Sequence, residues 1–467
     1  MNINLQTNSN PDNQLVENLE DANKVFLSFA LKISPVNFHL LLADFLKGSD
    51  SVYYFSQPER NISFLAIEQL AKQTFDVFNF AQLNKEVEII KGKMISNFSE
   101  FKEFDFPLFL TSAKFPVKKI SNEWKDFGEI DLIIPKISLY RKSDSYFLIY
   151  NIFTESFSHD ENFYETLELH AQKIYDLELQ LKDNTDKKSS INHFEQSDDS
   201  ENWSKKIEAA LEKIKQSSIE KVVLSRRLLY DVQSEINWQN ALKELDEKYP
   251  ACTNFVIKSG HSIFFGSTPE LLARFSGNDF YTEALAGSIM RGSNSNEDLL
   301  LENDLLNSLK NKVEHDVVTE HLKNSLINYS KKIEIDEKPI VKKLSNIQHL
   351  QTAVKGSLKH GANMFDVVSS LFPTPAVCGI PKDFSLQIIE ENEDFDRGLF
   401  AGLIGWFNTE GFGDFNVAIR SALIKENKLY IYAGCGIVEG SNPVEEFEET
   451  QLKLKPILSL FDLADAN

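Results

Sequence analysis

Two carboxylates near the C-terminus have the spacing of a cation site. Glu446 and Glu449 lie three residues apart and Lys453 follows four residues later, so on a helix the three side chains share one face. Carboxylate oxygens are the ligands that a hard divalent cation prefers. The same spacing is more often that of an ordinary solvated acidic face, so this pair alone does not predict a cation site.

The residues before this pair predict how it is held. Residues 429–433 are apolar and aromatic, which indicates a strand, and the glycine-rich stretch 434–440 indicates a turn. After Pro443 a helix is expected, because proline is favoured at the first helical position. Glycines allow backbone N–H groups to approach an anion closely. We therefore expect the carboxylates to stand beside a site for a small anionic ligand.

Four more residues could carry chemistry, although each also has an ordinary structural interpretation. Lys221 opens the apolar run KVVLSR and could be a surface lysine at a strand end. Glu270 follows a proline and could be a turn residue or a helix cap. Glu314 could be one more charge on an exposed helix face, and His349 could be a histidine satisfied within the core.

Arg420 is harder to explain in structural terms alone. It lies in the apolar run VAIRSALI, residues 417–424, which predicts a strand. A guanidinium among buried aliphatic side chains requires a partner, often a carboxylate held by two hydrogen bonds. The run LAGSIMRG, residues 285–292, is interrupted by glycines, which is common where backbone lies near a ligand. Several residues of this kind in one chain are stronger evidence for a functional site than a single one.

Composition excludes several classes of protein. A chain of 467 residues with 42% hydrophobic content can bury a large core, in one domain or two. It contains no stretch of about eighteen apolar residues, so no membrane span is expected. A formal charge of −21 argues against nucleic acid and anionic membrane surfaces as partners. An anionic substrate would need a local cluster of cations or a bound metal.

Cysteine usage and the N-terminus predict a cytoplasmic protein. Cys252, Cys378 and Cys435 are too few and too scattered for a disulfide framework or a zinc site. Residues 1–14 are polar and lack the basic and apolar regions of a signal peptide.

Hydrophobic patterning predicts a mixture of strands and helices. The first 181 residues contain expected strands at 52–55 and 147–153 and an expected helix at 161–181, but no pattern of chemistry. Residues 182–202 are polar and charged, which predicts a linker or surface loop. The elements expected after that boundary are a helix at 203–216, strands at 221–227, 255–258, 262–266, 402–407 and 417–424, and a long helix at 299–329.

The second part of the chain resembles the chorismate-binding enzymes. The resemblance covers about residues 205–460 and rests on these motifs in order: KVVLSR, STPELL, LAGS, VEH, QHL, PTPAV, AIRSA and AGCGIVEGSNPVEEFEETQLK. The family includes isochorismate synthases, salicylate synthases and the large subunits of anthranilate and aminodeoxychorismate synthases, and the chain looks closest to the isochorismate synthases.

This resemblance implies an α+β fold of two stacked, mostly antiparallel β-sheets flanked by helices, with the site in a cleft between the layers. Residues 1–181 would then be a variable N-terminal portion of the same fold, 182–202 a linker or loop, and 203–467 the chorismate-binding catalytic region. The implied partner is the small molecule chorismate, with no nucleic acid or membrane, and the implied state is a monomer or homodimer.

The resemblance also implies roles for the residues singled out above. Lys221 matches the base that activates water, and Glu270 matches the general acid on the opposite face of the substrate ring. Glu314 and Glu449 match Mg²⁺ ligands, with Glu446 in a supporting or water-mediated role. The residues that match the substrate-binding positions are Gly287, Ser288, His349, Ala376, Arg420, Gly434 and Lys453.

Two positions separate activities within the family. Relatives that use ammonia typically carry Gln or Ala in place of Lys221, so lysine favours water as the nucleophile. Relatives that go on to eliminate pyruvate and form salicylate typically carry Thr in place of Ala376, so alanine favours isochorismate as the product. Val377 departs from the leucine typical of the family. The open alternatives are a salicylate synthase, an anthranilate or aminodeoxychorismate synthase component, and a catalytically silent chorismate-binding subunit. An isochorismate product would feed menaquinone or siderophore synthesis.

Overall fold

The structure is a computed structural model that describes residues 24–75, 80–117, 121–155, 163–182, 188–193, 200–216 and 219–463. Residues 1–14, and with them the predicted lack of a signal peptide, lie outside this part of the chain. All 22 described strands belong to one hydrogen-bonded network. Among these strands, only two pairs are parallel: β1 (Val25–Ile33) with β4 (Met94–Ser96), and β8 (Ser189–His193) with β22 (Phe461–Leu463).

The network branches at β6 (Ile130–Lys142). One edge of β6 pairs with β3 (Ile62–Phe75). The other edge pairs with β5 (Phe109–Ala113) through residues 130–133 and with β7 (Ser145–Thr154) through residues 137–142. Two arms of sheet therefore leave β6, one through β3 and one through β5, whereas β7 leads to β1.

The first arm ends at the strand that carries Lys221. It continues from β3 through β2 (Ser51–Gln57), β10 (Thr253–Ser259), β11 (Ser262–Thr268), β20 (Ser421–Lys425), β21 (Lys428–Val438) and β9 (Lys221–Val232). Beyond it, β9 also pairs with β8 and with β17 (Gly379–Ile380).

The second arm ends at the strands that carry Ser288 and His349. It continues from β5 through β18 (Leu403–Phe407), β19 (Gly413–Val417), β12 (Leu271–Ser276), β13 (Asp279–Met290) and β16 (Ile347–Leu358). The outer edge of β16 pairs with β14 (Ser330–Ile335) and β15 (Ile340–Lys343). The two arms correspond to the two stacked sheets that were predicted, and the mostly antiparallel α+β fold is confirmed.

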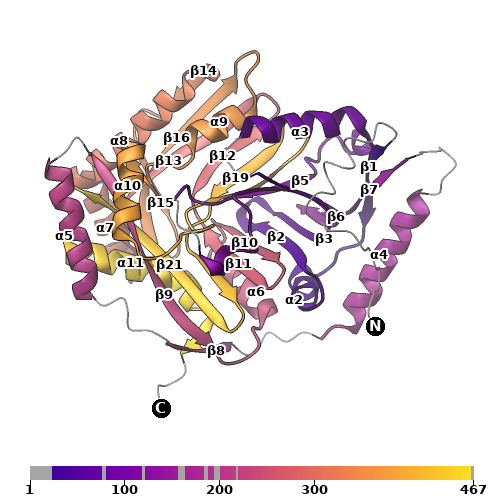
Figure 1. Ribbon diagram of the computed structural model, residues 1–467, viewed down its shortest axis with the longest axis horizontal. Helices are drawn as coiled ribbons and strands as arrows, with labels where there is room; N and C mark the ends of the chain where they lie inside the picture. The colour runs from indigo at the N-terminus through magenta and orange to yellow at the C-terminus, as the bar shows by residue number, and fades with distance from the viewer. Residues whose placement is uncertain are drawn as a thin grey trace.

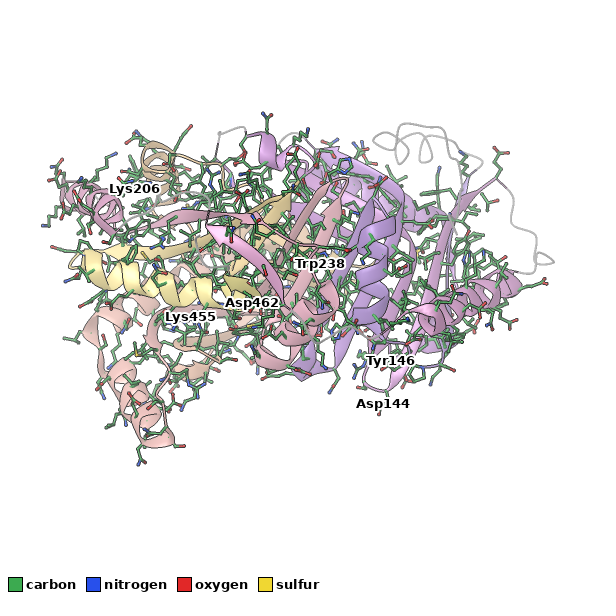
Figure 2. All side chains as sticks on the ribbon, turned by 90° about the horizontal axis from the view of Figure 1, so that it is seen from below. Asp144, Tyr146, Lys206, Trp238, Lys455 and Asp462 are labelled. Carbon is green, nitrogen blue, oxygen red and sulfur yellow. The ribbon has the colours of Figure 1, made fainter. Side chains whose placement is uncertain are left out.

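Helices cover both arms (Figure 1). They are α2 (Phe38–Gly48), α3 (Phe80–Lys93), α4 (Phe163–Gln180), α5 (Ser200–Gln216), α6 (Trp238–Lys248), α7 (Ser295–Asn307), α8 (Leu309–Leu326), α9 (Met364–Leu371), α10 (Lys382–Asn392) and α11 (Pro443–Leu458). Helix α8 packs on β13, and α11 packs on β21 and α5. In Figure 2, Lys206 of α5 and Lys455 of α11 lie toward one end of the molecule, and Asp144 and Tyr146 at the β6–β7 turn lie toward the other.

Alternation along the strands produces two hydrophobic cores. In β10, Phe255 and Ile257 face a core shared with residues of the second arm, such as Phe415. The intervening Val256 faces a second core, which the first arm shares with helices, for example through Leu242 of α6. Successive side chains of a strand point to opposite faces, so one sheet arm separates two cores. The cavity described below opens at the edge of the first core, between the arms.

Three predicted elements differ in the structure. The predicted linker 182–202 carries β8, which pairs with β9 and β22, and parts of that segment lie outside the described residues. The expected helix 299–329 is divided at Ser308, whose hydroxyl accepts a hydrogen bond from the N–H of Asn311 and so caps α8. The expected strand 429–433 continues to Val438, so Gly434 lies within β21 rather than in a turn.

The expected strand 417–424 is also divided, and its interruption contains Arg420. The chain leaves the second arm at Val417 and enters the first arm at Ser421, and Arg420 adopts the left-handed conformation with φ of 51°. A continuous strand could not pass from one arm to the other at this point. The bend places the Arg420 backbone where its carbonyl accepts a hydrogen bond from the N–H of Ser267.

No helix in the described part of the chain is long and apolar enough to cross a membrane.

Candidate active site

A cavity of about 740 Å³, its open mouth included, lies between the two arms. It collects residues from β9 and β21 of the first arm, from β13 and β16 of the second, from the bend at Arg420, and from α8 and α11. Of the residues that the sequence singled out, those that line it are Lys221, Glu270, Gly287, Ser288, Glu314, His349, Ala376, Arg420, Gly434, Glu449 and Lys453. Only Glu446 is outside the lining.

Lys221 is a buried residue of the cavity wall and not a surface lysine. It is 2% exposed, and its ammonium donates to Oε1 of Glu314 at 2.7 Å. Strand β21 runs alongside β9, and at Gly436 a Cβ would lie 2.6 Å from Lys221 Cε and 3.0 Å from Glu314 Oε1. Glycine at this position therefore gives the lysine and its partner the room that they occupy.

Lys221 also determines the charge of Glu314. Burial alone would raise the pKa of this carboxyl, but the charge and hydrogen bond of Lys221, together with the charges of Lys453 and Lys310, outweigh burial, so its pKa is lowered. Glu314 is consequently ionised, as a metal ligand must be. Glu314 is therefore not simply one more charge on an exposed helix face, because it lines the cavity and pairs with Lys221.

Glu270 is a buried carboxylic acid in different surroundings. Its backbone is fixed because its N–H donates to Thr268 Oγ1 at 3.2 Å and its carbonyl accepts from the N–H of Val417 at 3.0 Å. Burial, and next the negative charge of Glu283, raise the pKa of Glu270 to about 8. Within the described residues, no cation forms an ion pair with its carboxyl. Glu270 therefore carries a proton at neutral pH and can donate it.

The C-terminal acidic helix contributes one carboxylate to the cavity. Asn442 caps α11 by accepting from the N–H groups of Val444 and Glu445, and Pro443 occupies the first turn. Glu449 pairs with Lys453 at 2.6 Å, and the Lys453 ammonium also donates to the carbonyl of Gly434 at 3.0 Å. The helix therefore holds Glu449 and Lys453 against β21, with their charges matched.

Glu446 lies behind this pair. Its carboxylate accepts from Lys310 of α8 at 3.1 Å, and its pKa is raised by burial and then by the charge of Glu449. The negative charges of Glu446, Glu449 and Glu314 all act on the ammonium of Lys310. Three carboxylates on two helices therefore share one region, although each has its own lysine.

This carboxylate set fits a magnesium ion held mainly by water and substrate. Mg²⁺ takes oxygen ligands and commonly needs only one or two protein carboxylates, and Glu314 and Glu449 both line the cavity. The repulsion that Glu449 exerts on Glu446 is of the kind that a divalent cation relieves. No compact group of three His, Cys, Asp or Glu ligands occurs in the described part of the chain, so a cage made of protein alone does not fit.

Arg420 presents a charge to the cavity and has no ion-pair partner among the described residues. It is 4% exposed, and its Nε–H lacks a hydrogen-bond acceptor among the described residues. The carboxylate partner that the sequence predicted is therefore not supplied by the described part of the chain. A buried guanidinium without a partner is unfavourable, so an anionic ligand in the cavity is the natural acceptor.

His349 and Ser288 form a neutral, polar part of the wall. Ser288 Oγ lies 2.9 Å from His349 Nδ1, which is also 3.3 Å from the carbonyl of Gly287. Burial, then the charges of Arg420 and Lys453, keep the pKa of His349 well below its usual value. Its Nε2 is buried without a partner among the described residues, so His349 is not a fully satisfied core histidine.

Gly287 shapes this wall through its backbone. It has φ of 77° and lies at a bulge of β13 between Ala286 and Ser288. A Cβ there would lie 3.1 Å from Asn311 of α8. Glycine therefore permits both the left-handed conformation and the close approach of the helix that carries Glu314.

Sequence reasoning missed Arg397, which also lines the cavity. It is 1% exposed and forms two hydrogen bonds with Glu393, at 2.8 and 2.5 Å. It also donates to the carbonyls of Val377 and Val223 at 2.8 and 2.9 Å, and so ties the loop of Ala376 to β9. The i, i+4 spacing of Glu393 and Arg397 was the available signal, but it is also that of any exposed helical ion pair.

Fold and cavity together define an α+β protein with a polar site between two sheet arms, suited to a small molecule that carries more than one negative charge. The chain belongs to the chorismate-binding enzyme family, because the family model described as "Chorismate binding enzyme" matches residues 13–462.

Individual relatives carry two different names. Isochorismate synthase MenF of Bacillus subtilis (strain 168) is 34% identical over 344 residues, which cover 74% of this chain and 72% of the relative. Anthranilate synthase component 1 of Saccharolobus solfataricus is also 34% identical, over 270 residues that cover 57% of this chain and 63% of the relative. The solved structure of MenF, the menaquinone-specific isochorismate synthase from Escherichia coli, matches with a TM-score of 0.75 at 22% identity and covers 96% of this chain and 98% of that one. This last likeness shows the fold.

Proposed function

We propose that this chorismate-binding enzyme is an isochorismate synthase. The observation that carries the proposal is that one cavity contains both a buried lysine, Lys221 of β9, and a protonated carboxylic acid, Glu270 of the β11–β12 connection. Such a pair suits a reaction that needs a base and an acid on opposite faces of one molecule. The isochorismate synthase among the relatives, matched over 74% of this chain, supports the same activity.

The reaction exchanges one hydroxyl group for another. Water attacks the terminal carbon of the ring's conjugated diene, both double bonds shift by one position, and the hydroxyl on the carbon next to the other end of the diene leaves as water. Lys221 must first release its ammonium proton to solvent, and its neutral amine then takes a proton from the attacking water. Glu270 gives a proton to the departing hydroxyl, which would otherwise be a poor leaving group. One water enters and one leaves, so chorismate and isochorismate are isomers and the conversion is reversible.

Substrate binding follows from the distribution of charge. Chorismate carries two carboxylates. Lys221 and Arg397 of the cavity lining are engaged by Glu314 and Glu393, and the other two lining cations, Arg420 and Lys453, are proposed to bind these carboxylates. Ser288, His349 and the backbone near Gly287 and Gly434 provide neutral polar contacts for the ring and its substituents. The methyl group of Ala376 adds a small apolar contact.

Glu314 and Glu449 are the residues proposed to hold Mg²⁺, with Glu446 supporting them. When bound, the ion would neutralise a substrate carboxylate and screen it from the acidic protein. Within the chain, Lys221 keeps Glu314 ionised, and Lys453 positions Glu449 through their 2.6 Å ion pair. Both carboxylates are therefore ready to act as ligands.

The main competing activity is that of an ammonia-using synthase, since an anthranilate synthase component is as similar in identity over a shorter stretch. Ammonia is itself a nucleophile and needs no strong base, whereas Lys221 provides one for water. The family resemblance associates alanine at position 376 with isochorismate as the product. Ala376 therefore argues against continuation to salicylate and pyruvate. The acid, the base and the proposed metal ligands are all present together, which argues against a silent binding subunit.

One experiment separates these activities. The purified chain is incubated with chorismate and Mg²⁺, with and without ammonium, and the products are resolved by chromatography while lactate dehydrogenase reports pyruvate. We expect isochorismate in reversible equilibrium, no dependence on ammonium, and activity lost with a chelator and restored by Mg²⁺. Anthranilate or aminodeoxychorismate formed with ammonium, stoichiometric pyruvate, or no turnover at all would each overturn the proposal.

A further inference from the structure

A buried ion pair lies directly behind Glu270 and outside the cavity lining. Lys342 of β15 donates to Oε1 of Glu283 of β13 at 2.5 Å and approaches the carbonyl of Pro269 at 3.4 Å. Pro269 is the residue immediately before the acid. The second oxygen of Glu283 accepts from the hydroxyl of Tyr281 at 3.0 Å and from the side-chain amide of Gln351. Both carboxylate oxygens of Glu283 therefore have partners, and neither member of the pair lines the cavity.

Strand register explains why the two residues meet. Glu283 of β13 is opposite Ala353 of β16, and Lys342 of β15 is opposite His349 of β16. Residues 349, 351 and 353 alternate along β16, so these side chains lie on one face of the sheet. That face also presents His349 to the cavity. The ion pair thus continues the cavity wall away from the substrate and toward the Pro269–Glu270 peptide.

The charges around Glu270 come from every element packed against it. The cations that favour its ionised form are Lys342 of β15, Lys221 of β9 and Lys453 of α11, and Arg420 interacts with it from the bend between the arms. The cavity also contains Glu314 and Glu449, each engaged by a lysine. After burial, Glu283 is the strongest influence that favours the protonated form.

We propose that the Glu283–Lys342 pair positions and tunes the general acid of the reaction assigned above, Lys342 by tethering the Pro269 carbonyl and Glu283 by placing a negative charge behind Glu270. The proposal rests on the proposed function, because it concerns the acid of that reaction. Glu283 and Lys342 are positioning residues, since they act through Glu270. The negative charge of Glu283 disfavours proton loss from Glu270, whereas the positive charge of Lys342 favours it. Their ion pair also holds the Pro269–Glu270 peptide in place.

The test compares two variants in the full-length protein. Glu283→Gln keeps the size and the hydrogen-bonding capacity of the side chain but removes its charge, so Lys342 is left to promote ionisation of Glu270. We expect the alkaline limit of kcat to move about one pH unit lower, which is about a tenfold loss on the alkaline limb and little loss near pH 6. The double variant Glu283→Gln/Lys342→Met removes both charges. Its alkaline limit should return toward that of the wild type, while kcat falls at all pH values and KM stays nearly constant because the tether is gone.

A readout independent of turnover accompanies the kinetics. The carboxylic acid band of Glu270, assigned by its loss in Glu270→Gln, is titrated by infrared difference spectroscopy, and its midpoint should move in the same directions. The matched control is Lys343→Met, which removes the neighbouring β15 lysine bound to Asp298 and Glu302 and should leave the midpoint unchanged.

An unchanged midpoint in Glu283→Gln, or identical midpoints in the single and double variants, would overturn the inference. Absence of isochorismate from the wild type would instead overturn the proposed function, and the infrared titration would still report on the pair.

Discussion

Two parts of the cavity wall treat their carboxyl groups in opposite ways. In the wall formed by the first arm with α8 and α11, charges come in pairs: Lys221 with Glu314 at 2.7 Å and Lys453 with Glu449 at 2.6 Å. In the β11–β12 connection, Glu270 has no ion-pair partner within the described residues, and its pKa is raised to about 8 by burial and then by Glu283. One wall therefore holds ionised groups and the other holds a neutral acid.

This difference teaches that surroundings, and not residue type, decide what a glutamate does. A buried carboxyl stays charged where an opposite charge lies beside it and takes up a proton where none does. Glu314 is half-buried and Glu270 is buried, and both line one cavity, yet their pKa values are shifted in opposite directions. The first three predictions below remove either a residue of an ion pair (Lys221, Glu314 or Glu449) or the unpaired acid, Glu270.

The largest effect is expected from Lys221→Ala, which removes the base and leaves Glu314 without its partner. Isochorismate formation should fall by about a thousandfold or more, within the range for loss of a general base or acid. Chorismate binding, measured by calorimetry, should remain detectable because Arg420 and Lys453 are intact. The control is Lys215→Ala, an exposed lysine of α5. Turnover near the wild-type rate in Lys221→Ala would end the assignment of the base.

The next effect concerns the unpaired wall. Glu270→Gln removes the proton donor and should reduce kcat by about a hundredfold or more, with a smaller effect on KM. In the wild type the acid must be protonated, and because the pKa of Glu270 is about 8, kcat should fall as the pH rises through about 8. A stopped assay across the pH range measures both. An alkaline limit that persists unchanged in Glu270→Gln would show that another group titrates there.

Removing one carboxylate from the paired wall should have a smaller, metal-dependent effect. Glu314→Gln or Glu449→Gln should raise the Mg²⁺ concentration required for half-maximal rate by about tenfold or more, since each removes one of the few carboxylates that such a site uses. Binding of Mn²⁺ followed by electron paramagnetic resonance should weaken in parallel. The matched controls are Glu445→Gln and Glu448→Gln on the exposed face of α11. If all four variants behave alike, the helix is merely a solvated acidic surface.

Much of the architecture could be predicted from periodicity and motif order. The strands at 52–55, 147–153, 255–258 and 262–266 and the helix that begins at Pro443 follow from local patterns, whereas the mostly antiparallel α+β fold was implied by the resemblance to the chorismate-binding enzymes. The interruption at Arg420 could not be predicted, because VAIRSALI is uniformly apolar and the break is imposed by passage between the arms. The continuation of β21 through Gly434 likewise depends on pairing with β9, some two hundred residues earlier.

The candidate site, too, could be predicted only in part from the sequence. Its residues could be named from their motifs, but their protonation could not, because it depends on neighbours that strand pairing brings together. Glu270 owes its proton to burial and to Glu283, and nothing near Glu270 in the sequence indicates either. Arg397 was missed because its partner Glu393 makes it look like one half of an ordinary helical ion pair. The break at Ser308 did have a local signal, the preference of serine for the residue that caps a helix.

The smallest effect on rate is expected at Ala376, which belongs to neither arm. It lies on the loop that Arg397 ties to β9 through Val377 and Val223, and it lines the cavity. Its substitution should therefore change where the reaction stops more than how the acid and base are charged. We expect the wild-type chain to release isochorismate with little pyruvate or salicylate.

Isochorismate can still lose its enolpyruvyl group as pyruvate while its ring becomes aromatic, so a synthase must hold the product in a geometry that disfavours this step or release it first. Threonine at position 376 would add a hydroxyl and a second branch beside the ring and shift the bound molecule. Because productive alignment is worth orders of magnitude in rate, a small shift is enough to affect both steps. Ala376→Thr should lose synthase rate about fivefold to tenfold and gain measurable pyruvate release, followed by coupling to lactate dehydrogenase, with Ala376→Ser as the matched control that adds the hydroxyl without the branch. Synthase loss without any pyruvate would mean that the loop sets only the rate, and the product would then be determined by the two arms alone.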